Sequence, residues 1–165
     1  MTGATAARHR RDAAERYRPD VVDLLLVAEA PPSAPDRFFY FEHVTTHDSL
    51  FRYVVRGILG ETPSRDKAPY LDELCARGVF LVHLSDEPFT SWADVVPQCV
   101  PGLVRRCRAL APNRIVLVGA RTYDYAYDAL MGAGLPVVDV RLPYPGSGQQ
   151  RRFAEGFDLA LRLAQ

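Results

Sequence analysis

Cysteine is scarce in this chain, and its three cysteines, Cys75, Cys99 and Cys107, include no closely spaced Cys-x-x-Cys pair. An odd number of cysteines without that spacing is not typical of a disulfide framework or of a zinc knuckle. Free cysteines commonly pack as small apolar residues. We therefore expect a packing role for all three.

Long apolar runs are absent too. The longest, from Val21 to Ala28, is interrupted by Asp23 and is far too short to cross a bilayer. The first twenty residues have no uninterrupted apolar core behind their basic residues, as a secretory signal would have. We expect a cytoplasmic protein with no membrane partner.

The chain also lacks net charge, because 20 Lys and Arg residues balance 20 Asp and Glu residues. The strong positive field that usually marks a nucleic-acid-binding protein is therefore absent, and any attraction to phosphate must be local. Lysine occurs once, at Lys67, so the basic residues are almost all arginine. Arginine suits bidentate contacts with phosphate.

What is present is enough for one folded domain. The chain has 165 residues, 48% of them hydrophobic and 24% charged, which is close to the globular average. Residues 1–20 are rich in Ala and Arg and predict a basic helix or arm that ends before Pro19. This segment either docks loosely on the body or touches a polyanion. Residues 21–165 predict a single α/β domain.

Short β-rich runs alternate with helical patterns beyond residue 20, which is typical of a mostly parallel sheet covered on both faces. Four short apolar runs predict the strands, at residues 24–28, 79–84, 115–118 and 137–140. We therefore expect a three-layer α/β/α architecture around a four-stranded sheet.

Apolar residues at spacings of three and four predict the helices between these strands. One helix spans about residues 50–59, with Asp48 as its cap and Gly60 as its stop. A second spans residues 96–110, where Pro97 and Pro101 require the first turn to begin late. Two further helices are expected at residues 123–131 and 153–163.

In open α/β sheets, ligands bind beyond the carboxyl ends of the strands. Glu29 directly follows the first strand and precedes two prolines, so its carboxylate is held in that crevice. Four adjacent aromatic residues then occupy positions 38–41. Because a loop cannot easily hide four adjacent rings, we expect some of them to line a pocket and stack on a flat ligand.

The loop after the fourth predicted strand carries Gly-Ser-Gly at residues 146–148, followed by Gln149 and Arg151. Glycines at a helix start expose backbone N–H groups, and the helix N-terminus adds partial positive charge, which favours an anion such as phosphate. The alternative is a plain turn, since these residue types often make turns.

The histidines allow several interpretations. His83, at the end of the second strand, is either a hydrogen-bonded core residue or a group that reads a base edge or donates a proton. His43 and His47 have no third ligand nearby in the sequence, and Asp48 is more useful as a helix cap. We therefore expect no metal site.

The order of these segments resembles the uracil-DNA glycosylase superfamily. The sequence Ala28-Glu29-Ala30-Pro31 is similar to the first motif of the branch in which that motif reads Gly-Glu-Ala-Pro-Gly. Residues 143–147, Pro-Tyr-Pro-Gly-Ser, are similar to the second motif. The resemblance spans about residues 23–153 and implies a glycosylase-like fold for the domain.

The resemblance also implies roles for individual residues. Glu29 matches the acid that orients water or stabilises the sugar cation, and His83 matches the strand-end residue that reads the base edge and stabilises the leaving base. An aromatic that stacks on the extruded base is expected among Phe38, Phe39 and Phe41. The residues expected to bind DNA or phosphate lie in the second-motif loop: Pro143, Gly146, Ser147, Gly148, Gln149 and Arg151.

The chain departs from the family at three places. The histidine that begins the second motif is absent, since Leu142 precedes Pro143. Ala28 and Pro32 replace the two glycines of the first motif and stiffen that turn. No cysteines match those that hold the iron–sulfur cluster of the related branch, so we expect neither a cluster nor another cofactor.

The implied activity is that of a monofunctional DNA glycosylase, which hydrolyses the N-glycosidic bond of a damaged or modified base extruded from DNA. We expect the chain to be a monomer. A bifunctional lyase needs an amine for a Schiff base, and the only lysine, Lys67, is expected in a loop away from the strand ends. Two alternatives stay open: a non-catalytic binder of modified or damaged bases, and an enzyme that acts on free nucleosides or nucleotides.

Overall fold

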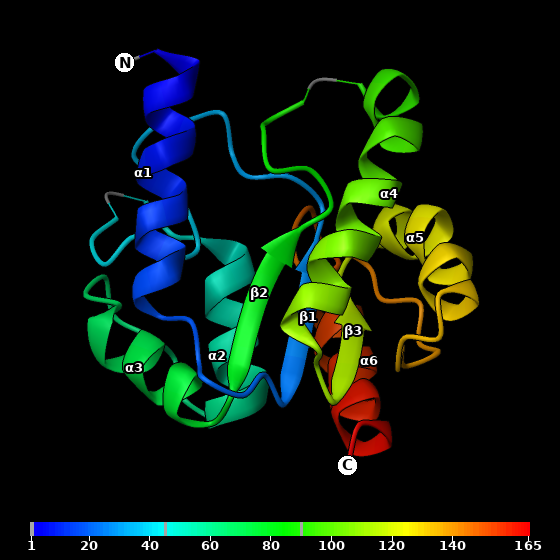
Figure 1. Ribbon diagram of the computed structural model, residues 1–165. Coiled ribbons are helices and arrows are strands. Elements are labelled where there is room, and N and C mark those ends of the chain that lie inside the picture. The colour runs from blue at the N-terminus through cyan, green and yellow to red at the C-terminus, as the bar shows by residue number, and fades with distance from the viewer. Residues whose placement is uncertain (1, 45, 90) are drawn as a thin grey trace.

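A computed structural model of the protein describes residues 2–44, 46–89 and 91–165. These residues form a mixed α/β fold, as predicted, with helices on both sides of a parallel sheet (Figure 1). In chain order the elements are α1 (Gly3–Arg16), β1 (Leu24–Ala28), α2 (Ser49–Leu59), α3 (Ala68–Ala76), β2 (Val79–His83), α4 (Trp92–Leu110), β3 (Arg114–Leu117), α5 (Ala120–Gly132) and α6 (Gln150–Leu163).

The sheet has three parallel strands in the order β2-β1-β3, with Ala28 of β1 opposite His83 of β2. The predicted fourth strand is not part of it. Val137 forms only an isolated parallel bridge with Ile115. Next to that bridge, the backbone N–H groups of Val137 and Val140 donate to carbonyls only two residues back. These local bonds replace the ladder that a continuous strand would need.

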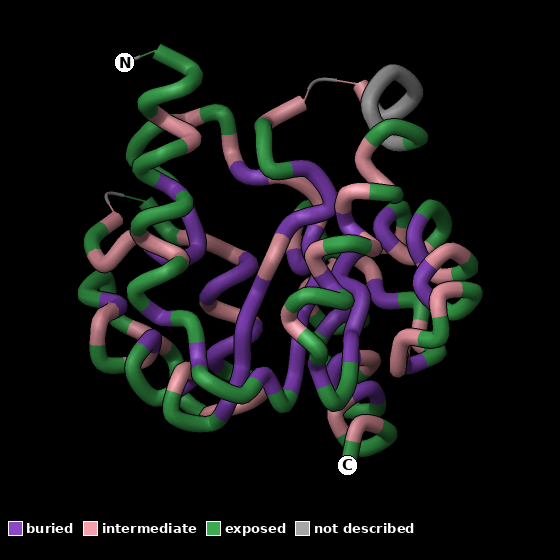
Figure 2. Tube along the Cα trace, in the orientation of Figure 1, coloured by how far each residue is buried: buried purple, intermediate pink, exposed green. Residues whose placement is uncertain are grey.

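The core lies between the sheet and its helices. Apolar side chains of β1 are fully buried, as a strand covered on both faces requires. In Figure 1, α4 crosses in front of the sheet, while α2 and α6 lie behind it. The burial colouring of Figure 2 shows the same arrangement, with buried strands inside and exposed outer helix faces. Within the described residues, no helix is long and apolar enough to span a membrane.

The helix predictions are confirmed for α2 and corrected for α4. The side chain of Asp48 accepts a hydrogen bond from the Phe51 N–H, and Gly60 ends α2 in the left-handed conformation (φ +72°). Helix α4 begins at Trp92, so both Pro97 and Pro101 lie inside it rather than at a late start. Both prolines are exposed, and water can therefore hydrate the backbone carbonyls that lose a helical donor.

Helix α1 is docked on the body of the domain by side chains. Arg10 donates to Glu87 Oε2 (3.1 Å), and the hydroxyl of Tyr17 donates to Glu42 Oε1 (2.6 Å). The helix ends at Arg16, before Pro19 as predicted. These contacts hold α1 on the β2 side of the sheet (Figure 1).

β2 is an edge strand, and its outer side is covered by polar side chains. The Tyr40 hydroxyl accepts a hydrogen bond from the Leu81 N–H (2.7 Å). Arg106 of α4 donates to the carbonyl of His83 (2.8 Å). Such side-chain contacts protect a sheet edge against pairing with another chain.

Candidate functional site

The carboxyl end of β1 opens into a hollow of about 520 Å³, which we call the Glu29 hollow. Its walls come from the loop after β1 and the loop after β2. The lining residues are Glu29, Ala30, Pro31, Pro32, Ser33, Pro88 and Phe89. The prediction that Glu29 lies in a crevice at the strand end is confirmed.

Gly119, between β3 and α5, makes room for the Glu29 side chain. A Cβ atom at residue 119 would lie 2.7 Å from Oε1 of Glu29 and 3.1 Å from its Cγ. Gly119 also adopts φ +106°, a conformation that other residues rarely take. The carboxyl group of Glu29 therefore rests against the start of α5, and a larger residue at 119 would displace it.

The environment of Glu29 suits proton transfer. Burial raises the pKa of its carboxyl above the usual glutamate value, and the guanidinium of Arg121 on α5 partly opposes that shift. A carboxyl with a raised pKa is closer to neutral pH, where it can exchange a proton.

Tyr144, from the loop before α6, lies in the same electrostatic neighbourhood. This residue is 37% exposed. The pKa of its phenol is raised by burial of the hydroxyl group and by the negative charges of Asp48 and Glu29, and Arg37 opposes the shift. Tyr144 is therefore a neutral hydrogen-bond donor at physiological pH.

His83 and Glu29 are not brought together. His83 lines a second hollow, between α1, β2 and α4, and does not line the Glu29 hollow. The imidazole is 7% exposed and stacks on Phe38, with 5.6 Å between the ring centroids. Burial and the nearby Arg106 and Arg10 lower the pKa of His83 to about 3, so its ring is neutral at physiological pH. It cannot act there as a charged donor.

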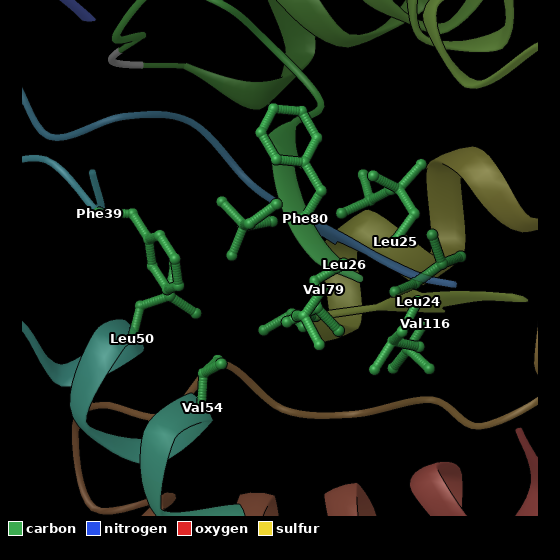
Figure 3. Packing of buried hydrophobic residues seen from close by; sticks show 14 of the residues in the cluster. Leu24, Leu25, Leu26, Phe39, Leu50, Val54, Val79, Phe80 and Val116 are labelled. Atoms are coloured by element: carbon green, nitrogen blue, oxygen red, sulfur yellow. The ribbon is translucent and has the colours of Figure 1, made fainter. Parts of the chain in front are cut away.

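The expectation that the aromatic run is hard to bury is wrong. Phe38, Phe39 and Tyr40 are between 3% and 6% exposed. Adjacent rings pack on different elements, since Phe39 contacts Phe51 of α2 and Tyr40 contacts Phe80 of β2. Phe39 points to Leu50 and Val54 of α2 (Figure 3).

Phe41 is half-buried. Its ring contacts His9 of α1, with 4.8 Å between the ring centroids. None of Phe38, Phe39 and Phe41 lines the Glu29 hollow.

The second-motif loop is largely a surface turn. Ser147 (φ +51°) and Gly148 (φ +81°) are exposed and left-handed. The Gly146 N–H donates to the Tyr144 carbonyl (2.8 Å), and the Gln149 N–H donates to the Gly146 carbonyl (3.0 Å).

The ends of this loop differ in exposure. Pro143 is half-buried, whereas Arg151 is exposed and pairs with Glu155 four residues along α6 (3.0 Å). The loop does lead into α6, as expected, and its role toward phosphate stays a prediction.

The expectation that Lys67 lies in a loop is corrected. This residue is buried at the start of α3, with 1% exposure. Its Nζ donates to the Phe38 carbonyl (2.9 Å) and lies 3.6 Å from Oδ2 of Asp48 and 4.3 Å from the ring centre of Phe51. Burial lowers its pKa to about 8, against the opposing effect of Asp48. Lys67 does not line the Glu29 hollow.

Two residues of this site were missed from the sequence. Phe89 supplies the aromatic surface of the Glu29 hollow, and it lies in the loop that leaves β2. Gly119 stands alone between a buried strand and a helix, where a glycine signals a close approach.

In the described residues, no group of three or more His, Cys, Asp or Glu side chains is arranged to hold a metal ion. Comparison of the sequence with models of known protein families and with curated proteins gave no match.

Proposed function

We propose that this chain is a monofunctional glycosylase that hydrolyses the N-glycosidic bond of a damaged or modified base in DNA. The observation that carries the proposal is Glu29, held in a hollow at the carboxyl end of the central strand with an aromatic ring in the same wall. A hollow of this position and size suits a flat ligand of the dimensions of a base.

We propose further that the fold is of the uracil-DNA glycosylase type. The strand order β2-β1-β3, with residues 137–140 next to β3, supports a four-stranded sheet of the uracil-DNA glycosylase type in which the last strand is reduced to one bridge. The match of the motifs around Glu29 and in residues 143–147 supports it as well. The family's activity is inferred from these features together.

In the proposed reaction, Glu29 acts as the carboxylate. Cleavage of the glycosidic bond builds positive charge on the sugar, which a nearby carboxylate stabilises while it orients the attacking water. Phe89 offers the surface on which the extruded base stacks. Because burial raises the pKa of Glu29, base release should increase as pH rises through that raised value, since the ionised form is the active one.

We propose monofunctional chemistry because the amine of Lys67, the only lysine of the chain, is out of reach of a bound sugar. Lys67 is 1% exposed, and its Nζ is bonded to a backbone carbonyl. A Schiff base would need this group to leave its buried site and attack the sugar. Strand cleavage without added base or lyase would contradict this part of the proposal.

One observation favours a second candidate, a binder that recognises a modified base without releasing it. The leaving base carries negative charge, and the described residues that line the Glu29 hollow include no histidine, lysine or arginine. His83 is neutral and lies in the other hollow. A glycosylase of this design would depend on donors outside this lining, such as Tyr144 and Arg121, which both interact electrostatically with Glu29.

The test is base release from oligonucleotides that carry uracil, hypoxanthine, xanthine or an alkylated base, in single- and double-stranded form. The proposal predicts release of at least one of these bases and a loss of release in Phe89→Ala. Salt-sensitive binding to the oligonucleotides without any release would select the binder instead. Binding of free nucleotides without affinity for oligonucleotides would reject both candidates.

A further inference from the structure

The proposed reaction does not use the hollow that contains His83, which we call the His83 hollow. Its volume is about 550 Å³, and its lining residues come mainly from α1, β2 and α4. Figure 1 shows where these elements lie. This volume falls within the roughly 300–1,000 Å³ typical of small-molecule sites. The loop after β2 separates the two hollows. Asp86 and Glu87 of this loop line the His83 hollow, and Pro88 and Phe89 line the Glu29 hollow.

The floor of the His83 hollow is apolar and contains aromatic rings. Phe38, Phe80 and Leu81 line it, and each is at most 6% exposed. The rings of Phe38 and His83 are close to parallel, with an interplanar angle of 28°. Such a floor favours a ligand with a flat apolar body, because burial of that body removes apolar surface from water and allows ring stacking.

His83 supplies polar recognition within this floor. Its imidazole makes no hydrogen bond to the part of the chain that the structure describes, and its nitrogens are not among the buried polar atoms that lack a partner, so they are open to solvent in the hollow. Since burial keeps the ring neutral, one nitrogen can donate and the other can accept. Both nitrogens are therefore available to a molecule that enters the hollow. A ligand in the hollow would supply a hydrogen-bond partner.

Arg10 supplies a positive charge at the wall. This arginine is 9% exposed, and its hydrogen bonds to Glu87 Oε2 (3.1 Å) and to the Asp86 carbonyl (3.3 Å) both use Nη2. Its Nη1 and Nε make no hydrogen bond to described residues. The partner carboxylate of Glu87 is 58% exposed, so the pair is weak and leaves the guanidinium free to bind a second anion.

We propose that the His83 hollow binds a small organic anion with a flat apolar body, such as an aromatic carboxylate. The flat body lies on Phe38 and Phe80, the carboxylate accepts from Arg10, and a polar atom of the ligand bonds to His83. This site is separate from the Glu29 hollow, and the inference does not depend on the proposed glycosylase activity.

The experiment uses 1-naphthoate as the probe, titrated into the whole chain by calorimetry and by ¹H–¹⁵N NMR. Its neutral isostere 1-naphthamide has the same flat body without the charge. We expect saturable binding of one naphthoate per chain and amide shifts on α1, β2 and α4. Since charge-assisted hydrogen bonds contribute about 1.5–3 kcal/mol, we expect the amide to bind at least about 10-fold more weakly.

Four variants locate the site. Ala109→Trp should abolish binding, because residue 109 lines the hollow from α4 and a larger side chain fills it. Arg10→Met should weaken naphthoate binding about 10-fold or more, and His83→Phe by about 2- to 10-fold. Arg8→Met is the matched control, since Arg8 is exposed on α1 and does not line the hollow. Its affinity should stay within about 2-fold of wild type.

The proposal is overturned if naphthoate does not saturate, if naphthamide binds as tightly, or if Ala109→Trp binds like wild type. Equal weakening in Arg8→Met and Arg10→Met would show general attraction to a basic helix instead. Should Arg10→Met undock α1, the comparison of the two probes on the wild-type protein and the Ala109→Trp variant still decides the outcome.

Discussion

Replacing Gly119 by alanine tests whether the Glu29 side chain occupies the space that the missing Cβ leaves. A non-glycine residue at φ +106° costs about 1–3 kcal/mol of backbone strain. The added Cβ would also lie 2.7 Å from Oε1 of Glu29, well inside the ordinary contact distance, and crowding of this kind costs about 1–3 kcal/mol more. We therefore expect Gly119→Ala to lower the free energy of unfolding by about 2–6 kcal/mol.

The two contributions can be separated in a double-mutant cycle. In a Glu29→Ala background the crowding disappears, because both the carboxylate and Cγ are gone, and only the backbone strain should remain. The expected coupling energy is about 1–3 kcal/mol, measured by urea unfolding of the four proteins. Gly134→Ala is the control, since Gly134 also has positive φ (+77°) but no atom within 4 Å of the added Cβ. Equal costs of Gly119→Ala in both backgrounds would refute the described packing of Glu29.

Three further predictions concern stability. The pKa of Lys67 is lowered from 10.5 to about 8, so the folded state holds this proton less tightly than the unfolded state. The free energy of unfolding should therefore rise with pH in wild type relative to Lys67→Met. We expect a rise of about 2 kcal/mol between about pH 7 and pH 9.5, measured in urea titrations. A parallel pH dependence of the two proteins would contradict this. The pKa of Glu29 is shifted in the opposite direction, so the folded state holds its proton more tightly than the unfolded state. Glu29→Gln should therefore melt at a higher temperature than wild type at neutral pH, and this gain should shrink toward about pH 4.5. A lower melting temperature of Glu29→Gln at neutral pH would contradict a buried carboxylate. Tyr40→Phe should cost about 1–3 kcal/mol and expose the Leu81 amide to hydrogen exchange, because that N–H loses its acceptor, while Tyr53→Phe should leave this amide protected.

The elements best predicted from the sequence are those set by local chemistry. The cap at Asp48 and the stop at Gly60 frame α2, because a side-chain acceptor and a left-handed glycine act on adjacent backbone. The short apolar runs of β1 and β3 are found within one residue of the expected positions. The position of Glu29 followed from the rule that ligands bind at the carboxyl ends of parallel strands.

Most of the features that could not be predicted depend on distant contacts. The burial of Phe39 follows from the path of its loop over α2, which no local pattern specifies. His83 lies in a different hollow from Glu29 because the loops and helices around the sheet define two separate spaces at its edge. The fourth strand has the expected composition, but local bonds around Val137 compete successfully with the ladder. In the first two cases tertiary contacts override the pattern of the residues themselves, whereas in the third the competing bonds are local.

The measurement that tests the central claim most directly is single-turnover base release by wild type and Glu29→Gln on the oligonucleotide that wild type processes fastest. Removal of the carboxylate should slow release by about 10²- to 10⁴-fold without loss of DNA binding. Glu73→Gln, which changes an exposed carboxylate on α3, should release the base at the wild-type rate. Release by Glu29→Gln at the wild-type rate would contradict the assignment of this hollow as the active site.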